Sequence, residues 1–138
     1  MKFEVRNAKY GDAEGINRAR YEAWLTTYPN KKYRILTADI HFNFKKQLTP
    51  EALKKQNKRN ASPKPGVGLF VATHNNKIVG MCRVLKHKRY SMLSALYVLP
   101  EFQGKGVGSL LWKKAYAFTG KENNIFLTVA IYNERAIR

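Results

Sequence analysis

Hydrophobic positions in the second half of the chain change from a strand spacing to a helix spacing and back. Residues 93–99 form an apolar run, and residues 125–131 form another that is nearly continuous. Between them, apolar residues recur every three or four positions, which is typical of one face of a helix: Val107, Leu110, Leu111, Ala115 and Phe118. The pattern predicts a strand, a helix that ends at Gly120, and a fully buried strand that pairs parallel with the first.

The first half of the chain predicts an edge strand and several helices. Residues 2–6 alternate like a strand, and Asp12 is a candidate N-cap for a helix that ends near Tyr28–Pro29. We expect another helix over residues 39–47. The segment Thr49–Pro50–Glu51 predicts the start of a further one, because a capping threonine precedes proline at the first helical position.

The middle of the chain predicts three consecutive antiparallel strands. A loop rich in proline and glycine covers residues 61–68, and two segments of strand formers follow at residues 69–73 and 77–85. The intervening His74-Asn75-Asn76 indicates a hairpin turn. After a turn at residues 86–90, the third strand is the apolar run at 93–99. The fold class that this order favours is α/β, with helices and strands in one unit.

Length and composition indicate one domain. The 138 residues suffice for one core, and no run of 18 apolar residues is present to span a membrane. The N-terminus lacks the apolar centre of a signal peptide, so we expect a soluble, cytoplasmic protein. The single cysteine, Cys82, lies in an apolar strand, where a buried thiol is a simpler interpretation than a nucleophile.

The charge is strongly positive. The 26 lysines and arginines against 9 acids give a formal charge of +17, which attracts polyanions such as nucleic acid or a phosphorylated nucleotide cofactor. Charge alone does not choose between them. Many of the cations have the spacing of a solvated helix face rather than of a recognition surface: Lys45, Lys46, Lys54, Lys55, Lys58, Arg59 and Lys64.

The glycine-rich segment at residues 103–109 predicts an anion site. A helix that begins at glycines leaves its first amides unpaired and unobstructed, and its dipole and Lys105 add positive potential. The spacing fits neither the phosphate loop of nucleotide triphosphatases nor the dinucleotide fingerprint, because Ser109 stands where the last dinucleotide glycine belongs. It reads Gln-x-x-Gly-x-Gly, at Gln103, Gly106 and Gly108, directly after Leu-Tyr-Val-x-Pro-Glu.

That combination resembles the acetyl-coenzyme A signature of the GNAT superfamily of N-acetyltransferases. The order of elements, including Tyr132 to Ala136 after the last predicted strand, is similar along essentially the whole chain. The resemblance implies an α/β (α+β) acyl-CoA N-acyltransferase fold, a mixed central sheet with helices on both faces. It also implies acetyl-CoA as co-substrate, with no metal.

The resemblance assigns site residues as well. The fourth strand of such folds carries a bulge and splays from the fifth, and the unpaired backbone there serves the pantetheine. It implies that a backbone amide near Val98 stabilises the oxyanion. The implied cofactor-binding residues are Leu96, Tyr97 and Val98 for the pantetheine, Gln103, Gly104, Lys105, Gly106, Val107, Gly108 and Ser109 for the pyrophosphate, and Asn133 from the far side.

Two features depart from the family pattern. Where members often carry a glutamate as general base, this chain has residues Ser91 to Ser94, so Glu22 or His41, or a backbone carbonyl, would have to end a proton relay. The family's tyrosine acid would lie beyond Arg138. We therefore expect an incomplete domain without its last strands, whose apolar edge at residues 125–131 either pairs with another copy, as a homodimer, or remains disordered.

The leading hypothesis is thus acetyl transfer from acetyl-CoA to a primary amine, of a small molecule or a peptide, without a covalent intermediate. The alternative is a basic nucleic-acid-binding module without catalysis. Aromatic side chains between positions 24 and 44 either wall the acceptor pocket or fill the core: Trp24, Tyr28, Tyr33, Phe42 and Phe44.

Overall fold

The computed structural model describes residues 2–27, 45–88, 90–120 and 124–127. Several predictions therefore lie outside the described residues, among them most of the helix at 39–47, the end of the last strand, His41 and Asn133. The expectations of an incomplete domain and of a homodimer concern the same end of the chain. The single domain likewise stays a prediction.

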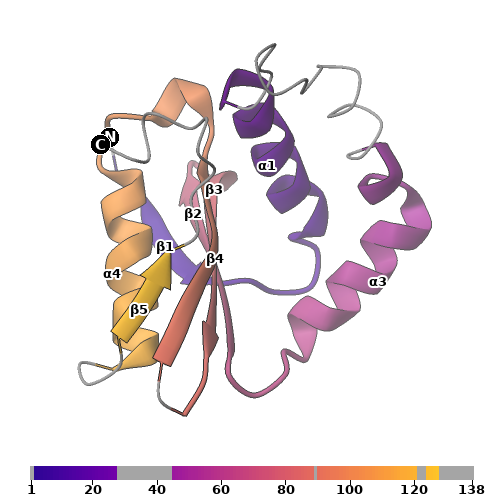
Figure 1. The fold of residues 1–138 in the computed structure, drawn as a ribbon. Helices are drawn as coiled ribbons and strands as arrows, with labels where there is room; N and C mark the ends of the chain where they lie inside the picture. The colour runs from indigo at the N-terminus through magenta and orange to yellow at the C-terminus, as the bar shows by residue number, and fades with distance from the viewer. Residues whose placement is uncertain (1, 28–44, 89, 121–123, 128–138) are drawn as a thin grey trace, which may run out of the picture.

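One mixed sheet forms the centre of the fold (Figure 1). The strands follow chain order across the sheet, and the first four are antiparallel while the fifth runs parallel to the fourth. They are β1 (Glu4–Asn7), β2 (Val67–His74), β3 (Lys77–Lys86), β4 (Tyr90–Val98) and β5 (Asn124–Leu127). The predicted edge strand, hairpin, third antiparallel strand and parallel last pair are all confirmed.

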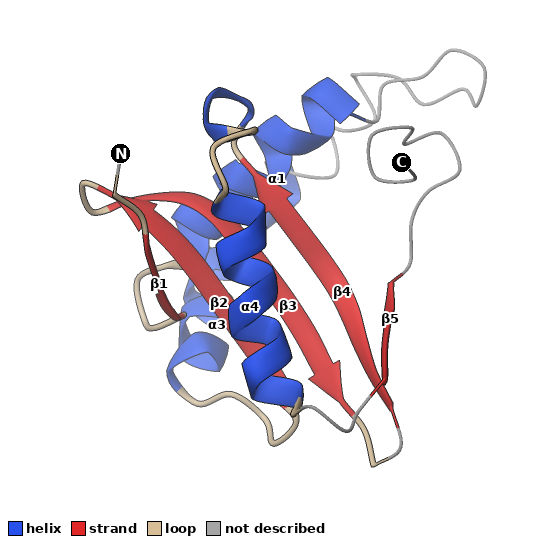
Figure 2. Cartoon of the chain, turned by 90° about the vertical axis from the view of Figure 1, so that its left-hand side faces the viewer, coloured by secondary structure: helices blue, strands red, loops and turns tan. Residues whose placement is uncertain are grey.

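Helices cover both faces of this sheet. Figure 1 shows α4 along one face and α1 along the other, with α3 outside α1, and Figure 2 shows α4 lying across β2 and β3. Their bounds are α1 (Ala13–Thr27), α3 (Pro50–Ala61) and α4 (Val107–Thr119), and a short 3-10 turn, η1 (Pro100–Phe102), joins β4 to the segment before α4. The observed architecture is the mixed α/β fold that the sequence predicted.

Local chemistry explains where the elements begin and end. The Thr49 hydroxyl accepts from the amide of Ala52 at 3.3 Å, and proline occupies the first turn of α3, as the sequence predicted. Asn75 and Asn76 both have positive φ, 51° and 65°, which a two-residue hairpin turn with the twist of its strands requires. α4 ends at Gly120, whose φ of 87° few other residues adopt.

The core lies on the two faces of the sheet. On the α4 side, Val107, Leu111 and Ala115 are fully buried against β2, β3 and β4. On the α1 side, Ile16 packs on Val71 and Met81. Each face thus receives the apolar stripe of one helix, which is why the helices take these positions.

Two details differ from the sequence prediction. Leu110 was placed on the apolar face of α4 but is 37% exposed, because the face that meets the sheet is centred on Val107, Leu111 and Ala115. Asp12 does precede α1, and its carbonyl accepts from Ile16, but its carboxylate accepts from Arg6 and the amide of Lys9. Its side chain therefore joins β1 to the loop before α1 instead of capping the helix.

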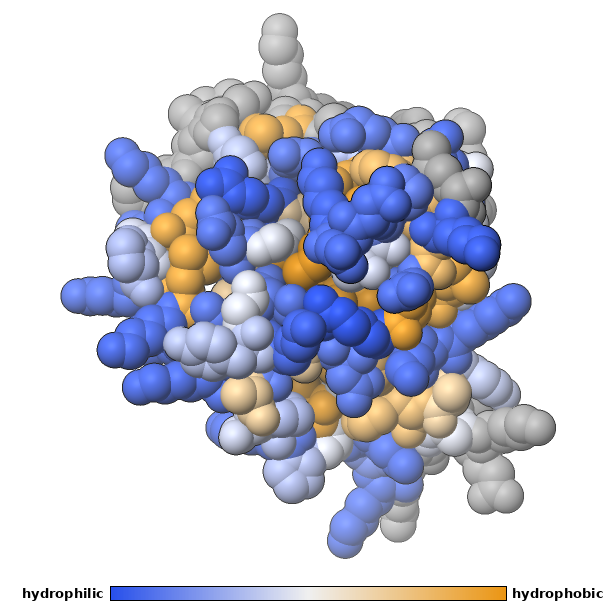
Figure 3. Space-filling view, turned by 180° about the vertical axis from the view of Figure 1, so that it is seen from behind, coloured by the Kyte–Doolittle hydropathy of each residue, from blue (hydrophilic) through white to orange (hydrophobic). Residues whose placement is uncertain are grey.

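The surface is largely hydrophilic on the face shown in Figure 3, where hydrophobic residues form separate small areas. On α3 the predicted cationic positions Lys54, Lys55, Lys58 and Arg59 are exposed. Among the described helices, none combines the length and hydrophobicity that crossing a membrane demands.

Candidate functional site

A bulge interrupts β4 at Ser94. Arg83 of β3 faces Ala95, whereas the next residue, Val84, faces Leu93, so Ser94 is an extra residue in the ladder. The Arg83 side chain donates to the Ser94 hydroxyl at 3.3 Å, and that hydroxyl lies 3.2 Å from the Arg83 carbonyl, to which it donates. The strand bends at such a position and its ladder is locally disrupted. The bulge that the family resemblance implied is therefore present.

Beyond the bulge, one edge of β4 faces no described strand. β5 pairs with β4 only from Tyr90 to Leu93, and among the described residues no strand lies beside residues 94–98 on that side (Figure 2). This open edge is where Leu96, Tyr97 and Val98 were predicted to contact a pantetheine. The side chains of Leu96 and Val98 pack toward the α4 core, and that of Tyr97 packs on the α1 face.

The amide of Val98 points toward the open edge. Successive residues of an extended strand direct their main-chain groups to opposite edges. Leu99 donates to Val79 of β3 at 2.8 Å, so the main-chain groups of Val98 face away from β3. The Val98 carbonyl accepts from the side-chain amide of Gln103 at 3.1 Å. A donor at the open edge has the orientation that a developing oxyanion needs.

Aromatic contacts hold the segment between β4 and α4. The Phe102 ring in η1 lies 6.1 Å from Phe3 and 5.7 Å from His74, between ring centroids. Together with the hydrogen bond from Gln103 to Val98, these contacts fix the start of the glycine segment against the sheet. Gln103 thus positions the loop through its side chain, a role that its place in the sequence motif did not reveal.

The glycine segment forms a concave row of amides. Gly104 and Gly106 have φ of 78° and 86°, and Lys105 between them does not have a positive φ, an alternation that turns successive N–H groups inward. The first helical bond of α4 runs from Leu110 to the Gly106 carbonyl. Within the described residues, the amides of positions 104–109 donate to no protein acceptor. We call this row, residues 104–109, the amide cradle.

The space in front of the glycines of the cradle is open. A Cβ atom built at Gly104, Gly106 or Gly108 would meet nothing within 4 Å. Six free donors at a helix N-terminus, with room before them, fit a pyrophosphate group. The predicted pyrophosphate residues are therefore together in one concave segment.

Of the two candidate bases, the described residues include only Glu22. Glu22 occupies an exposed position of α1, two residues from Arg20, and residues two apart on a helix do not share a face. His41 lies outside the described residues. Ser91, at the place of the family's frequent glutamate, is fully buried.

Arginine side chains near the open edge were missed at the level of sequence. Arg20 of α1 is half-buried, with its guanidinium carbon 5.9 Å from the ring centroid of Tyr97. Trp24, one turn later, lies 6.3 Å from the same ring. Burial lowers the pKa of Arg20 below its ordinary value; Tyr97 acts in the opposite direction, and the positive Arg83 adds to the lowering. In the sequence, the four-residue spacing of Arg20 and Trp24 could have indicated that both side chains lie on the same face of α1.

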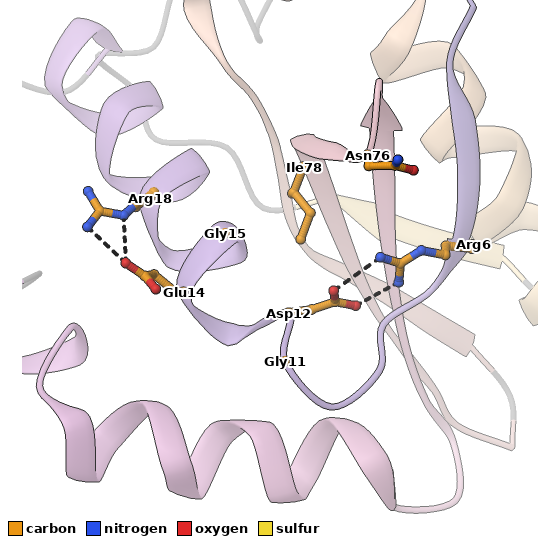
Figure 4. A pocket seen from close by; sticks show the side chains of 8 residues that line it. All are labelled: Arg6, Gly11, Asp12, Glu14, Gly15, Arg18, Asn76 and Ile78. Atoms are coloured by element: carbon orange, nitrogen blue, oxygen red, sulfur yellow. Dashed lines mark hydrogen bonds and ion pairs between the residues drawn. The ribbon is translucent and has the colours of Figure 1, made fainter.

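A separate surface pocket of about 340 Å³ lies at the N-terminal end of α1 (Figure 4). Its charged side chains are paired with one another, Arg6 with Asp12 at 2.7 Å and Arg18 with Glu14 at 2.9 Å. Its remaining lining residues are Gly11, Gly15, Asn76 and Ile78. Because these charges neutralise each other, the pocket gives no reason to expect a charged ligand.

The described part of the chain also contains no group of three or more histidine, cysteine or acidic side chains that could bind a metal ion. The site thus consists of main-chain amides, an open strand edge, and polar and aromatic side chains on the α1 face.

Comparison with known proteins adds a family match. A family model described as the acetyltransferase (GNAT) family matches residues 19–138. No curated protein sequence matches the chain.

Solved structures share the fold. The PaiA N-acetyltransferase of Thermoplasma acidophilum, solved with coenzyme A, has 21% identity and a TM-score of 0.81, covering 99% of this chain and 85% of that one. A GNAT family acetyltransferase of Brucella melitensis, solved with acetyl-CoA, has 19% identity and a TM-score of 0.63, with coverage of 99% and 81%. The ribosomal-protein-S18-alanine N-acetyltransferase of Escherichia coli has 16% identity and a TM-score of 0.60, with coverage of 99% and 72%.

Proposed function

This chain belongs to the GNAT family of acetyltransferases, and we propose that it transfers the acetyl group of acetyl-CoA to a primary amine. Acetyl-CoA is the donor that the family uses. The primary amine, the site residues and the direct mechanism are the parts of the proposal that go beyond family membership.

The amide cradle supports the placement of the donor. We assign the pyrophosphate to the amides of residues 104–109, where the dipole of α4 and Lys105 supply positive potential. The pantetheine would lie along the open edge of β4 at Leu96, Tyr97 and Val98, where the main-chain groups of Leu96 and the amide of Val98 face away from β3 and suit its amide groups. Two of the similar structures were solved with coenzyme A or acetyl-CoA, which supports coenzyme A as the carrier of the acetyl group.

The chemistry is acyl transfer by direct attack. The neutral amine nitrogen forms a bond to the thioester carbonyl carbon, the carbon–sulfur bond breaks, and the thiolate leaves and takes a proton. The carbonyl oxygen gains negative charge in the transition state, and we assign the amide of Val98, which faces the open edge, as the donor to it. Before the attack, a water chain would remove a proton from the substrate ammonium to give the neutral amine. The nitrogen then loses a second proton as the amide forms, and this balances the proton that the thiolate takes.

The single observation that carries the proposal is the row of six amides at the cradle, in open space, for which the described part of the chain offers no acceptor. The alternative, in which nucleic acid is the ligand, relies on the charge of +17 alone. No geometric feature of the cradle favours nucleic acid over a small pyrophosphate group.

Calorimetric titration with coenzyme A tests the proposal. Gly106 is a poor position for a disrupting variant, because its φ of 86° makes any other residue strained whatever the ligand does. Gly108 lies inside the first turn of α4, so Gly108→Glu strengthens the helix while its charge repels the pyrophosphate. We expect at least a tenfold loss of coenzyme A affinity in Gly108→Glu without loss of stability.

The neutral isostere Gly108→Gln is the matched control and should lose less affinity than Gly108→Glu. A folded protein that binds no coenzyme A, or one in which Gly108→Glu binds it as tightly as the unsubstituted chain, would contradict the proposal.

A further inference from the structure

Two positive side chains lie on the α1 face of the sheet beside the open edge of β4. Arg20 comes from α1 and lies 5.9 Å from the Tyr97 ring centroid, and Arg83 comes from β3 and donates to Ser94, three residues before Tyr97 in β4. Arg83 is exposed and fixed to the bulge through Ser94, whereas Arg20 is half-buried. We call Arg20 and Arg83 the arginine pair.

The arginine pair is placed next to the reacting position. Arg20 and Trp24 are four residues apart, so they share one face of α1, and both lie against Tyr97 at 5.9 and 6.3 Å. Tyr97 precedes Val98, whose amide faces the open edge. Arg20, Trp24 and Tyr97 therefore lie together on the α1 side of the strand that carries this amide.

The charges of the pair determine which acceptors are favoured. Guanidinium groups stay protonated at neutral pH, so the α1 face of the site is positive. A planar carboxylate matches the guanidinium fork, while a polyamine is repelled.

Resting on the proposed acetyl transfer, we infer that the acceptor is a small primary amine that also carries a carboxylate, which the arginine pair binds. The Trp24 and Tyr97 rings contact the apolar body of this acceptor. The similarity to known acetyltransferases does not assign this class.

Paired substrates that differ only in the carboxylate test the inference. Acetylation rates are measured for phenylalanine against phenylalanine amide and 2-phenylethylamine, and for lysine against 1,5-diaminopentane. We expect the KM of phenylalanine to be at least tenfold lower than that of its amide or of 2-phenylethylamine, and the KM of lysine to be at least tenfold lower than that of 1,5-diaminopentane. The amide is a stringent comparison because its amine is less basic and more of it is neutral, which by itself favours the amide.

Variants of the pair locate the effect. Arg83 is exposed, so Arg83→Gln should fold, and it should raise the KM for the carboxylate about tenfold while changing that of 2-phenylethylamine less than threefold. Arg20→Gln should act in the same direction. Arg18→Gln removes one positive charge from an exposed position of the same helix and should change neither value.

Binding measurements separate this inference from the proposed function. If coenzyme A binds but the amides or decarboxylated amines react as well as the carboxylates, the inference fails and acetyl transfer stands. The inference also fails if coenzyme A binds and N-acetylphenylalanine does not bind more tightly than its amide, or if Arg83→Gln affects both substrate types equally. Absence of coenzyme A binding overturns the proposed function itself.

Discussion

At the scale of single residues, burial decides what each polar side chain contributes. Asp12 keeps only 8% of its side chain exposed and accepts from both terminal nitrogens of Arg6, at 2.7 and 3.1 Å. Glu14 and Arg18 also form an ion pair, but the side chain of each is more than half exposed. The two ion pairs therefore differ in energy although they look alike in the sequence.

We predict that Arg6→Gln destabilises the fold by about 1–3 kcal/mol, because it leaves the carboxylate of Asp12 with fewer donors. Burial raises the pKa of Asp12, but the hydrogen bonds from Arg6 and Lys9 and their charges outweigh it, so the pKa lies below its ordinary 3.8. The stabilisation is thus present above that value and lost as pH falls through the folded pKa. Urea denaturation between pH 2.5 and 7 measures this.

Arg18→Gln is the control for this experiment and should cost no more than about 0.5 kcal/mol, because exposed pairs are screened by solvent. Equal losses of stability in Arg6→Gln and Arg18→Gln would contradict the difference assigned to burial.

Cys82 shows the same dependence on burial. It is fully buried, and desolvation raises the pKa of its thiol from 9.0 to about 12. At neutral pH it is a protonated thiol in the core, so no thiolate is available for a covalent acetyl intermediate.

We predict that Cys82→Ala keeps its acetyl transfer activity and loses one component of the alkaline pH dependence. Between pH 9 and 12 the unfolded thiol ionises while the folded one does not, so this group lowers stability as pH rises. From pH 8.5 to 10.5 the unsubstituted chain should lose about 1–2 kcal/mol more than Cys82→Ala in urea denaturation. Equal losses in both proteins would rule out the raised pKa.

At the scale of elements, close packing of α4 on the sheet sets the position of the cradle. A Cβ at Gly80 of β3 would lie 3.1 Å from Leu111, 3.1 Å from the Tyr97 carbonyl and 3.3 Å from Val107. The absent side chain thus allows the first turns of α4 to approach β3 beside the open edge of β4. The distance between cradle and strand edge depends on this contact.

We predict that Gly80→Ala weakens coenzyme A binding at least fivefold and destabilises the fold by about 1–3 kcal/mol, because the added methyl moves α4 or β4. Gly68→Ala is the matched control. Its Cβ would meet Phe70, Val84 and Phe118 at 2.9 to 3.0 Å, near the other end of α4. It should therefore cost similar stability but leave affinity intact. Calorimetry and thermal unfolding of both variants decide whether the cradle position matters.

At the scale of the whole molecule, the charge of +17 predicts association with polyanions that depends on salt. Binding that rests on exposed lysines and arginines releases counterions and weakens steeply as salt rises. The affinity for duplex DNA should fall by about three orders of magnitude between 50 and 200 mM salt and show no sequence preference. Coenzyme A at the proposed amide cradle should lose much less affinity over the same salt range.

Fluorescence titrations with labelled duplex DNA and calorimetry with coenzyme A, over one salt series, make this comparison. Binding of DNA that persists at physiological salt, together with absent cofactor binding, would favour the nucleic-acid-binding alternative.

The sequence by itself determined the elements and the identity of the cradle. Spacing of apolar residues, Thr49 before Pro50, the Asn75–Asn76 turn and Gly120 are local signals, because each acts within a few residues of chain. The glycine segment is also a local signal, because glycine at positions 104 and 106 permits the positive φ angles found there. These features could therefore be predicted without the fold.

Only the tertiary structure decided which side chains meet across elements. The bulge at Ser94, the role of Gln103 at Val98, the exposure of Leu110 and the position of Arg20 beside Arg83 depend on register and helix rotation. One residue of register or a fraction of a helical turn changes such contacts, while the local pattern of apolar positions stays almost the same. For that reason the residues that we propose for the donor came from the sequence, and those that we propose for the acceptor required the fold.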